Sequence, residues 1–271
     1  MIRPPAVSGR FYPADPQELA HQVQEYSFHD IAKDAPKSFA RGCIVPHAGY
    51  MYSGHVAGAV YASLEIPSRC ILFGPRHFPR GERMAILTEG SWETPLGIVP
   101  VDSELALELA RACSRLREDV AAHEREHSLE TQLPFLQKLA KDFRFVPVVL
   151  AADRYPIIEE LGHAVSKVVA AHTEPILVIA STDMNHYESD ELTRRKDQRA
   201  IARILALDPR GLFDTIREDR NTMCGYAATV AMLIAMQDLG ATEARLVRYA
   251  TSGDVTGDRD EVVGYAGIIV P

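Results

Sequence analysis

Three of the ten histidines share a position in the chain, because each follows a short apolar segment within a few residues. They are His47, His77 and His186. In open α/β sheets, ligands bind beyond the carboxyl ends of the strands. If the apolar segments are parallel neighbouring strands, the three imidazoles converge on one edge of a sheet. A single histidine in a loop is more often a surface or hydrogen-bonding residue, so the shared position is what predicts a common site.

Cys224 is the fourth candidate for this site. It stands at the start of a strongly apolar segment that predicts a helix over 225–238. A helix N-terminus stabilises a thiolate and lowers the pKa of the thiol, and a thiolate is a metal ligand or a nucleophile. The alternative is a buried cysteine that only packs. If the four side chains form one site, the sulfur must lie within ion-sharing distance of the rings of His47 and His77.

The other cysteines, Cys43, Cys70 and Cys113, lie in apolar strand-like or helical segments without CxxC spacing. In such positions cysteine behaves as a small hydrophobic residue. We therefore expect no disulfide framework, and a reducing cytoplasm as the compartment.

Further polar residues stand close to the candidate site in the sequence. Asp183 precedes His186 by three residues and could orient it or bind in its own right. His127 and Glu130 are three residues apart and share a face if the segment is helical. They form either an acid–base pair beside the site or a capping, solvent-facing pair. The remaining histidines are predicted to lie at the surface or at a helix cap: His21, His29, His55, His123, His163 and His172.

The elements that must position these residues can be read from hydrophobic pattern and capping signals. Asp15, Pro16 and Glu18 predict the start of a helix that ends near residue 28, with a loop over 29–39. Apolar segments predict strands at 43–46, 70–73, 83–88, 98–101, 143–150, 176–180, 244–250 and 262–270. Residues 47–54 predict a turn. Helices are predicted over 55–64, 103–113 with Asp102 as N-cap, 128–141 with a kink or late start at Pro134, 156–171, 190–206, 209–217 and 225–238.

Continuous apolar strands that alternate with helices are typical of a sheet buried on both faces. The predicted fold is an α/β, three-layer α/β/α sandwich with a mixed, largely parallel sheet. A chain of 271 residues with no linker or repeat is expected to form a single domain over 1–271.

Composition narrows the classes of function. The net charge is −8 and no basic stripe is present, which argues against nucleic-acid binding. No segment approaches the roughly 18 apolar residues of a membrane helix. The first residues, MIRPPAVSGRFYP, contain no apolar region typical of a signal peptide.

Ordered motifs along the whole chain resemble the MEMO family. They are SGRFYP at 8–13, PHAGY at 46–50, GPRH at 74–77, EHSLE with LPF within 126–135, STDMNH at 181–186, MCGY at 223–226, and the late YATSGD and GYAG. This family is similar in fold to the LigB-type class III extradiol dioxygenases, which agrees with the predicted sandwich.

The resemblance implies a metal site whose ligands are His47, His77 and Cys224, with Asp183 and His186 as the remaining polar residues of the pocket. It implies iron or copper and redox activity, with zinc as a possible substitute. Animal members of the family are also described as binding phosphotyrosine peptides in this pocket. Prokaryotic relatives occur beside a radical-SAM protein, so a partner of that kind is expected.

Two positions depart from the animal pattern. Phe78 stands where those members carry a second histidine, and Phe11 stands where they carry the tryptophan linked to peptide binding. Arg76, Tyr52 and Phe11 are expected to line a site for a small molecule or peptide.

The leading hypothesis is a metal-dependent oxidoreductase of dioxygenase-like descent in which His186, Asp183 and His127 act as acid–base groups. The alternatives are a non-catalytic module that binds an anionic or phosphorylated ligand, and a partner in a radical-SAM modification system.

Overall fold

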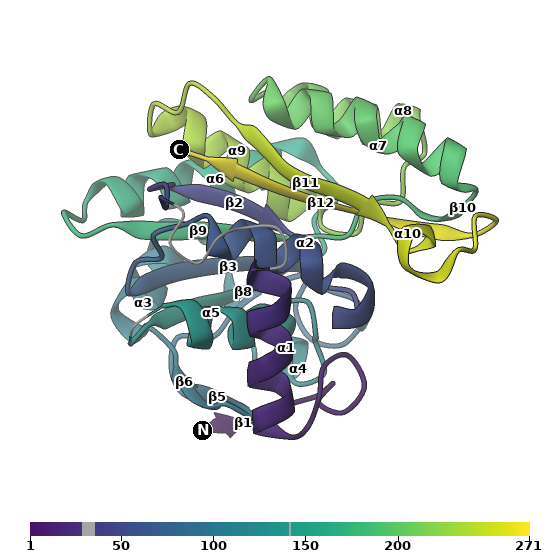
Figure 1. Ribbon diagram of the computed structural model, residues 1–271. Helices are drawn as coiled ribbons and strands as arrows, with labels where there is room; N and C mark the ends of the chain where they lie inside the picture. Colours follow the sequence, from purple (N-terminus) through teal and green to yellow (C-terminus); the bar gives the residue numbers. More distant parts are fainter. Residues whose placement is uncertain (29–35, 141) are drawn as a thin grey trace.

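A mixed β-sheet runs through the molecule, and its four central strands are parallel (Figure 1). The computed structural model describes residues 1–28, 36–140 and 142–271. Across the sheet the strands are β10 (His186–Glu188), β12 (Val262–Val270), β2 (Gly42–Val45), β9 (Ile176–Ser181), β3 (Arg69–Pro75), β8 (Arg144–Leu150), β4 (Met84–Ile86) and β7 (Arg117–Glu118), and β11 (Arg245–Thr251) also pairs with β12. Strands β2, β9, β3 and β8 form the parallel centre, and the pairings of β12 with its neighbours and of β4 with β8 are antiparallel.

Both faces of the central strands are buried, as their continuous apolar sequences predict. In β3, Ile71 and Phe73 point into one core, while Cys70 and Leu72 point into the other. The alternation follows from the two-residue period of a strand. Each face therefore needs its own covering layer.

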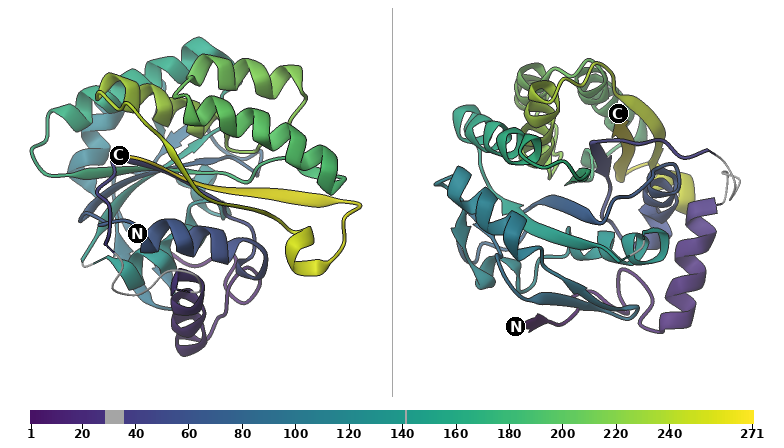
Figure 2. Two further views of the ribbon diagram at one scale, coloured as in Figure 1. Left: turned by 45° about the horizontal axis from the view of Figure 1, so that its top comes forward. Right: turned by 90° about the vertical axis from the view of Figure 1, so that its left-hand side faces the viewer.

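Helices supply the two layers (Figure 2). One face is covered by α3 (Ser103–Ala112), α6 (Tyr155–Ala170), α7 (Asp190–Leu205), α8 (Pro209–Glu218) and α9 (Tyr226–Asp238). The other is covered by α1 (Pro16–Phe28), α2 (Tyr50–Ala62) and α5 (Leu133–Leu139). The shorter elements are α4 (Val120–His123), the 3-10 helix η1 (Glu130–Gln132), α10 (Gly253–Thr256) and a small sheet of β1 (Ile2–Arg3), β5 (Ser91–Thr94) and β6 (Gly97–Pro100). The predicted α/β/α sandwich is confirmed.

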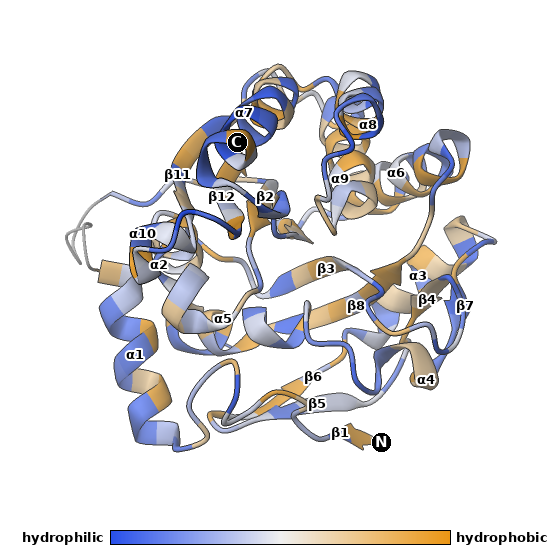
Figure 3. Ribbon diagram, turned by 90° about the vertical axis from the view of Figure 1, so that its right-hand side faces the viewer, coloured by the Kyte–Doolittle hydropathy of each residue, from blue (hydrophilic) through white to orange (hydrophobic). Residues whose placement is uncertain are grey.

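The hydropathy of the helices follows their position in these layers. Helix α9 is apolar on all sides because it packs against β9 and β3 and also against α6 and α8. Helix α7, at the outside, is largely hydrophilic (Figure 3). Within the described ranges, none of the helices combines the length and apolarity that crossing a bilayer requires.

The predicted turn over 47–54 is wrong in its second half, because α2 begins at Tyr50 and so includes Tyr52. Gly54, within the predicted turn, lies inside α2, and a Cβ there would lie 2.5 Å from the ring of Tyr26 on α1. A Cβ at Gly58 would lie 2.5 Å from the backbone of Tyr26, so this glycine lets α1 and α2 approach closely.

The helix predicted over 128–141 is shorter, since η1 and then α5 occupy 130–139 with Pro134 in the first turn of α5. A proline fits there because the first turn has free N–H positions. Strand β5 was missed: it pairs with β6 and β1, whereas β4 joins the main sheet. His29, most of the predicted loop over 29–39, and residue 141 lie outside the described residues.

Two buried side chains tie the start of the chain to the segment that follows α4. Arg3 donates to Glu130 at 2.7 Å, to the carbonyl of His123 and to the carbonyl of Glu126. Glu130 also accepts hydrogen bonds from Tyr12 and from backbone N–H groups of the N-terminal segment. The predicted pairing of Glu130 with His127 is therefore wrong, because Glu130 is fully buried and turned toward the N-terminus.

The prediction that His123 lies at the surface is also wrong. It is fully buried, its Nδ1 lies 2.8 Å from the carbonyl of Asp119, and its ring packs edge-on against Trp92. His21 and His163 are exposed as expected.

We predict that Arg3→Met lowers the free energy of unfolding by about 3 kcal/mol, because it leaves a buried carboxylate without its cation. Arg80→Met is the matched control, since Arg80 pairs with Glu124 at 2.8 Å but both side chains are more than half exposed. The control is expected to cost less than about 1 kcal/mol. Urea denaturation measures both changes, and equal losses would contradict the buried role of Arg3.

Candidate metal centre

The parallel pairing of β2, β9 and β3 brings three loops to one edge of the sheet. Val45 of β2 is level with Ser181 of β9, and Phe73 of β3 is level with Ala180 of β9. His47 and His77 each stand two residues beyond the end of their strand. The expected convergence of these loops is present.

Cys224 reaches the same edge from the other side of the sheet. It lies two residues before the first residue of α9 and next to Gly225. A Cβ at Gly225 would lie 2.4 Å from the carbonyl oxygen of Ser181 and 2.5 Å from the side chain of Thr182. The glycine therefore lets this loop pack directly on the end of β9, where the N–H of Gly225 donates to the hydroxyl of Thr182.

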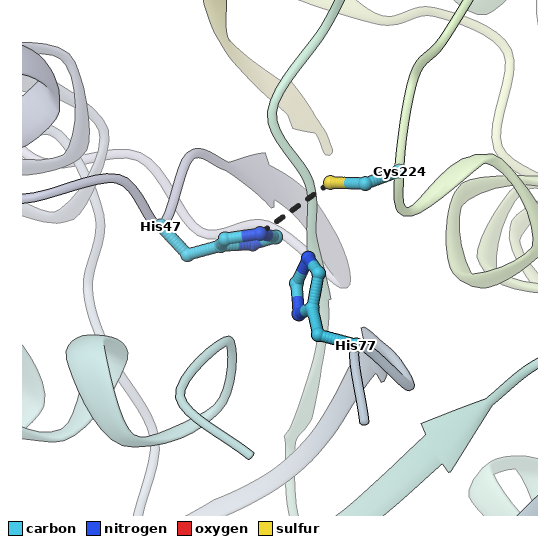
Figure 4. Close-up of side chains that lie close together, drawn as sticks. All are labelled: His47, His77 and Cys224. Carbon is cyan, nitrogen blue, oxygen red and sulfur yellow. Dashed lines mark hydrogen bonds between the residues drawn. The ribbon is translucent and has the colours of Figure 1, made fainter. Parts of the chain in front are cut away.

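Three potential ligand atoms meet at this point (Figure 4). The Sγ atom of Cys224 lies 3.4 Å from Nε2 of His47, and the ligand atoms of His47, His77 and Cys224 all lie within 4.8 Å of one another. A tetrahedral ion with typical Zn–N and Zn–S bond lengths separates its nitrogen and sulfur ligands by about 3.5 Å. The spacing of the donors fits a single ion.

The hydrogen bonds of Ser181 set the tautomer of His47. The Ser181 hydroxyl donates to the carbonyl of Ser128 at 2.7 Å and accepts from the amide of Gln132 at 2.9 Å. Its one proton is thus used, so the 2.9 Å contact with Nδ1 of His47 requires that Nδ1–H donates. The lone pair of His47 is consequently on Nε2, which faces the sulfur.

The carboxylate of Glu126 sets the tautomer of His77. One of its carboxylate oxygens lies 2.8 Å from Nδ1 of His77, and the other accepts from the backbone N–H of His77 at 2.7 Å. A carboxylate only accepts, so Nδ1 of His77 carries the proton and Nε2 is free to bind a metal. The sequence analysis missed Glu126, although it is the first residue of the EHSLE motif and directly precedes His127.

The pKa values of the two imidazoles, of His47 and His77, are shifted in opposite directions. Burial, together with the neighbouring His77, holds the pKa of His47 well below its ordinary value. Burial also lowers the pKa of His77, but the hydrogen bond and charge of Glu126 outweigh it and raise the pKa. The pKa of the Glu126 carboxyl is about 2, because the bonds and charges of its partners outweigh its burial. The site thus holds a carboxylate and a neutral His47.

The expectation of a lowered thiol pKa at Cys224 is wrong for the metal-free protein. Burial and the adjacent Asp183 carboxyl raise the pKa of this thiol. Cys224 precedes α9 rather than lying in its first turn, so the helix dipole is a weaker influence. The backbone N–H of Asp183 lies 3.3 Å from the sulfur and is the one donor of this kind pointing at it in the described part of the chain.

Asp183 serves the backbone of the His47 loop. One carboxylate oxygen accepts from the N–H of His47 at 2.8 Å and from that of Ala48 at 3.3 Å, and the other lies 3.9 Å from Nε2 of His47. Its pKa is raised by burial. Asp183 is therefore well placed beside the ligands.

His127 joins the site more closely than its sequence position suggested. Its ring stacks on that of His77 with centroids 4.4 Å apart and lies 5.6 Å from that of His47. Together with His77 and Glu126 it forms a second group of closely spaced potential ligands. Burial, together with the neighbouring His47, lowers its pKa to about 4, so it is neutral at physiological pH.

His186 lies at the margin of the site. It is the first residue of β10, it is half-buried, and it influences the titration of both His47 and Asp183. Its Nδ1 is buried and has no hydrogen-bond partner among the described residues. It is not among the tightly spaced ligand atoms.

The residues expected to line a ligand site are placed as follows. Phe11 packs edge-on against His127 with ring centroids 4.8 Å apart, and Tyr52 is half-buried on α2. The guanidinium of Arg76 donates to the carbonyls of Gly81 and Glu82, so it holds its own loop.

A buried carboxylate behind the site connects the two later loops. Asp197 of α7 accepts from the backbone N–H of Asn185 at 3.0 Å and from the side chain of Asn221 at 3.3 Å. Asn185 precedes His186, and Asn221 lies three residues before Cys224. Tyr249 donates to the other oxygen of Asp197 at 2.8 Å. Asp197 thereby fixes the loop of Asp183 and His186 against the loop of Cys224.

Comparison with known proteins places this chain among a defined set of relatives. Residues 3–269 match the family model described as Memo-like protein. The chain is 42% identical to a MEMO1 family protein of Methanopyrus kandleri, with 99% of both chains covered, and 42% identical to one of Methanothermobacter thermautotrophicus, with 98% of this chain and 99% of the relative covered. A crystal structure of an uncharacterized protein from Escherichia coli K12 has a TM-score of 0.55 at 12% identity, covering 84% of this chain and 98% of that one, which shows a shared fold.

The buried histidines predict a loss of stability in acid. Burial lowers the pKa of His123 from 6.5 to about 4. Below pH 6.5 this histidine is therefore protonated in the unfolded chain, whereas in the folded protein it stays neutral until the pH approaches 4. Stability due to this residue is thus lost as the pH falls from 6.5 toward 4. Between pH 7 and 4.5 we expect the free energy of unfolding of the chelator-treated wild type to fall by about 2 kcal/mol more than that of His123→Phe.

Urea denaturation at several pH values measures this difference in slope. Other groups with shifted pKa values, such as Asp197 with its pKa raised by burial to about 6, act equally in both proteins and cancel in the comparison. Replacement of the exposed His21 is the control and should change the slope much less than His123→Phe does. Parallel pH profiles for wild type and His123→Phe would contradict the assignment.

Proposed function

Because this chain belongs to the MEMO family, we propose that it binds one transition-metal ion through His47, His77 and Cys224 and uses that ion in redox chemistry. The observation that carries the proposal is the state of the two imidazoles. Both hold their Nδ1 proton in hydrogen bonds, to Ser181 and Glu126, and both direct Nε2 toward a thiol within ion-sharing distance. Metal-binding histidines characteristically have such a partner on the second nitrogen.

The donor set favours particular metals. Two imidazoles and one thiolate form a softer ligand set than two imidazoles and a carboxylate. The thiolate-containing set suits iron and copper and also accommodates zinc. When bound with three protein ligands, such an ion has open coordination positions and can exchange electrons with a small ligand. We infer iron or copper as the working metal.

Residues of the chain around the ligands supply proton handling and orientation. His127 is neutral and stacked on His77, so it can accept a proton from a ligand bound beside it. Asp183 holds the backbone of the His47 loop in place. The exposed face of the site is on the side of His77, which gives a ligand access.

The alternative function, binding of an anionic or phosphorylated ligand, has less support. An anion here would be held by Arg76 and by backbone N–H groups near Cys224, but the guanidinium of Arg76 already donates to two backbone carbonyls. The neighbouring side chains Glu126 and Asp183 are acidic, which disfavours an anion at this position.

We predict that freshly and anaerobically purified protein contains close to one iron or copper ion per chain and that Cys224→Ser removes most of it, since the thiolate is one of three ligands. Elemental analysis measures the content. Cys113→Ser is the control, because it makes the same chemical change at a fully buried cysteine elsewhere in the core. Full metal content in Cys224→Ser would refute the proposed ligand set.

We further predict that Glu126→Gln weakens metal affinity about 10- to 100-fold, as expected when a partner of a metal-binding histidine is altered. The amide can no longer act as an anion that orients His77. Competition with a chromophoric chelator measures the affinity. Glu124→Gln, an exposed change two residues away, should leave the affinity unaltered. An unchanged affinity in Glu126→Gln would mean that Glu126 has only a structural role.

A further inference from the structure

Several arginines line a cavity that is separate from the candidate metal centre. The cavity has a volume of about 520 Å³, which lies within the range of small-molecule pockets. Its lining includes neither the candidate metal ligands nor the polar residues beside them. The charged residues of the lining define what we call the arginine pocket: Arg83, Arg115, Arg117, Arg154, Glu82 and Asp153.

The pairing of β8, β4 and β7 brings these arginines together. Strand β4 is antiparallel to β8 and parallel to β7, so the starts of β4 and β7 lie at the carboxyl end of β8. Arg83 directly precedes β4, Arg117 begins β7, and Arg154 follows the end of β8. The carbonyl of Arg83 accepts from the N–H of Ala151 at 2.7 Å, which joins two of the three segments. Figure 3 shows the three strands next to one another at one end of the sheet.

The arginine pocket lies at the same edge of the sheet as the metal centre. Strands β3 and β8 are parallel, and Pro75 at the end of β3 is level with Leu150 at the end of β8. The segment from His77 to Arg83 therefore leads from the metal centre to the arginine pocket. Ligands of open α/β sheets bind beyond the carboxyl ends of the strands, so the pocket lies where this fold places ligands.

Two of the arginines have carboxylate partners that hold them weakly. The guanidinium of Arg83 lies 3.2 Å from Asp153, and that of Arg115 lies 2.6 Å from Glu160. Both guanidiniums are at least half exposed. Ion pairs at such exposed positions contribute little free energy, so these side chains can also contact another anion.

The other two arginines have no such partner. Within the described residues, neither Arg117 nor Arg154 lies within ion-pair distance of a carboxylate. A fifth guanidinium is close by, since Arg217 donates to the backbone carbonyl of Asp153 at 3.3 Å. The whole chain has a net charge of −8, so this excess of positive charge is local. A local excess of this kind attracts anions that the rest of the surface repels.

The position of Arg154 adds to the positive charge of the pocket. Arg154 is the N-cap residue of α6, where helices prefer a side chain that accepts a hydrogen bond. Its side chain makes no capping bond, and the first turn of α6 contains no acidic residue. A helix start carries partial positive charge, so a guanidinium there is unfavourable without a nearby anion. This helix start reinforces the site, which the arginines define.

We propose that the arginine pocket binds a small multivalent oxyanion, a compound with two or more phosphate or carboxylate groups. Guanidinium groups bind both kinds of oxyanion in bidentate pairs, and the two arginines without carboxylate partners, Arg117 and Arg154, are the principal contacts. The proposal goes beyond the metal-based function and does not depend on it, because the metal ligands are not part of this pocket.

Isothermal titration calorimetry with inorganic diphosphate and with propane-1,2,3-tricarboxylate tests the proposal on the protein as purified, at low ionic strength. We expect binding of at least one anion, and about tenfold weaker binding in Arg117→Met and in Arg154→Met, because each variant loses a charge-assisted contact. The anion that binds more tightly identifies phosphate or carboxylate as the preferred group. No heat with either anion at millimolar concentration, or unchanged affinity in either variant, would overturn the proposal.

Two further variants separate this pocket from general electrostatic attraction and from the metal centre. Arg245→Met removes the same charge from the exposed β11, at the other end of the sheet, and should leave the affinity unchanged. Cys224→Ser should also bind the anion as wild type does. An equal loss in Arg245→Met, or loss of binding in Cys224→Ser, would overturn the proposal. Metal content is measured on the same samples, so a failure of the metal proposal is recorded independently.

Discussion

The parallel pairing of β2, β9 and β3 is the constraint on which the site depends. It sets the ends of three buried strands at one level, so the loops that carry His47, His77 and Asp183 leave the sheet together. Burial of both faces makes this register hard to shift, because a slip by one residue would exchange the two cores. The sheet therefore acts as a rigid platform for short loops.

Hydrogen bonds to buried polar groups then orient the side chains on this platform. Ser181 at the end of β9 aligns His47, and Glu126 aligns His77. Glu126 is itself in a segment held by Arg3, and the loop of Cys224 is held by Asp197 through Asn221. Residues from the start, middle and end of the chain thus converge on a few atoms, which explains why the family motifs extend along the whole sequence.

The strand pattern was sufficient to predict the sandwich, and the positions of His47 and His77 after two strands were sufficient to predict that they meet. The inclusion of Cys224 followed from the family resemblance, because its position before a helix also allowed a cysteine that only packs. The sequence could not reveal which side chains form hydrogen bonds to these histidines. Glu126 and Glu130 lie in the same motif, but which one faces the site depends on the irregular path between α4 and η1. The burial of His123 and the raised pKa of the Cys224 thiol likewise arise from tertiary packing, which no local pattern encodes.

The three candidate ligands differ in exposure: His47 is buried, Cys224 is half-buried and His77 is exposed. An ion held by them would be shielded by the sheet on one side and accessible at a single imidazole on the other. His47, Cys224 and His77 would hold such an ion, and an entering ligand would reach it from the His77 side without any opening of the fold.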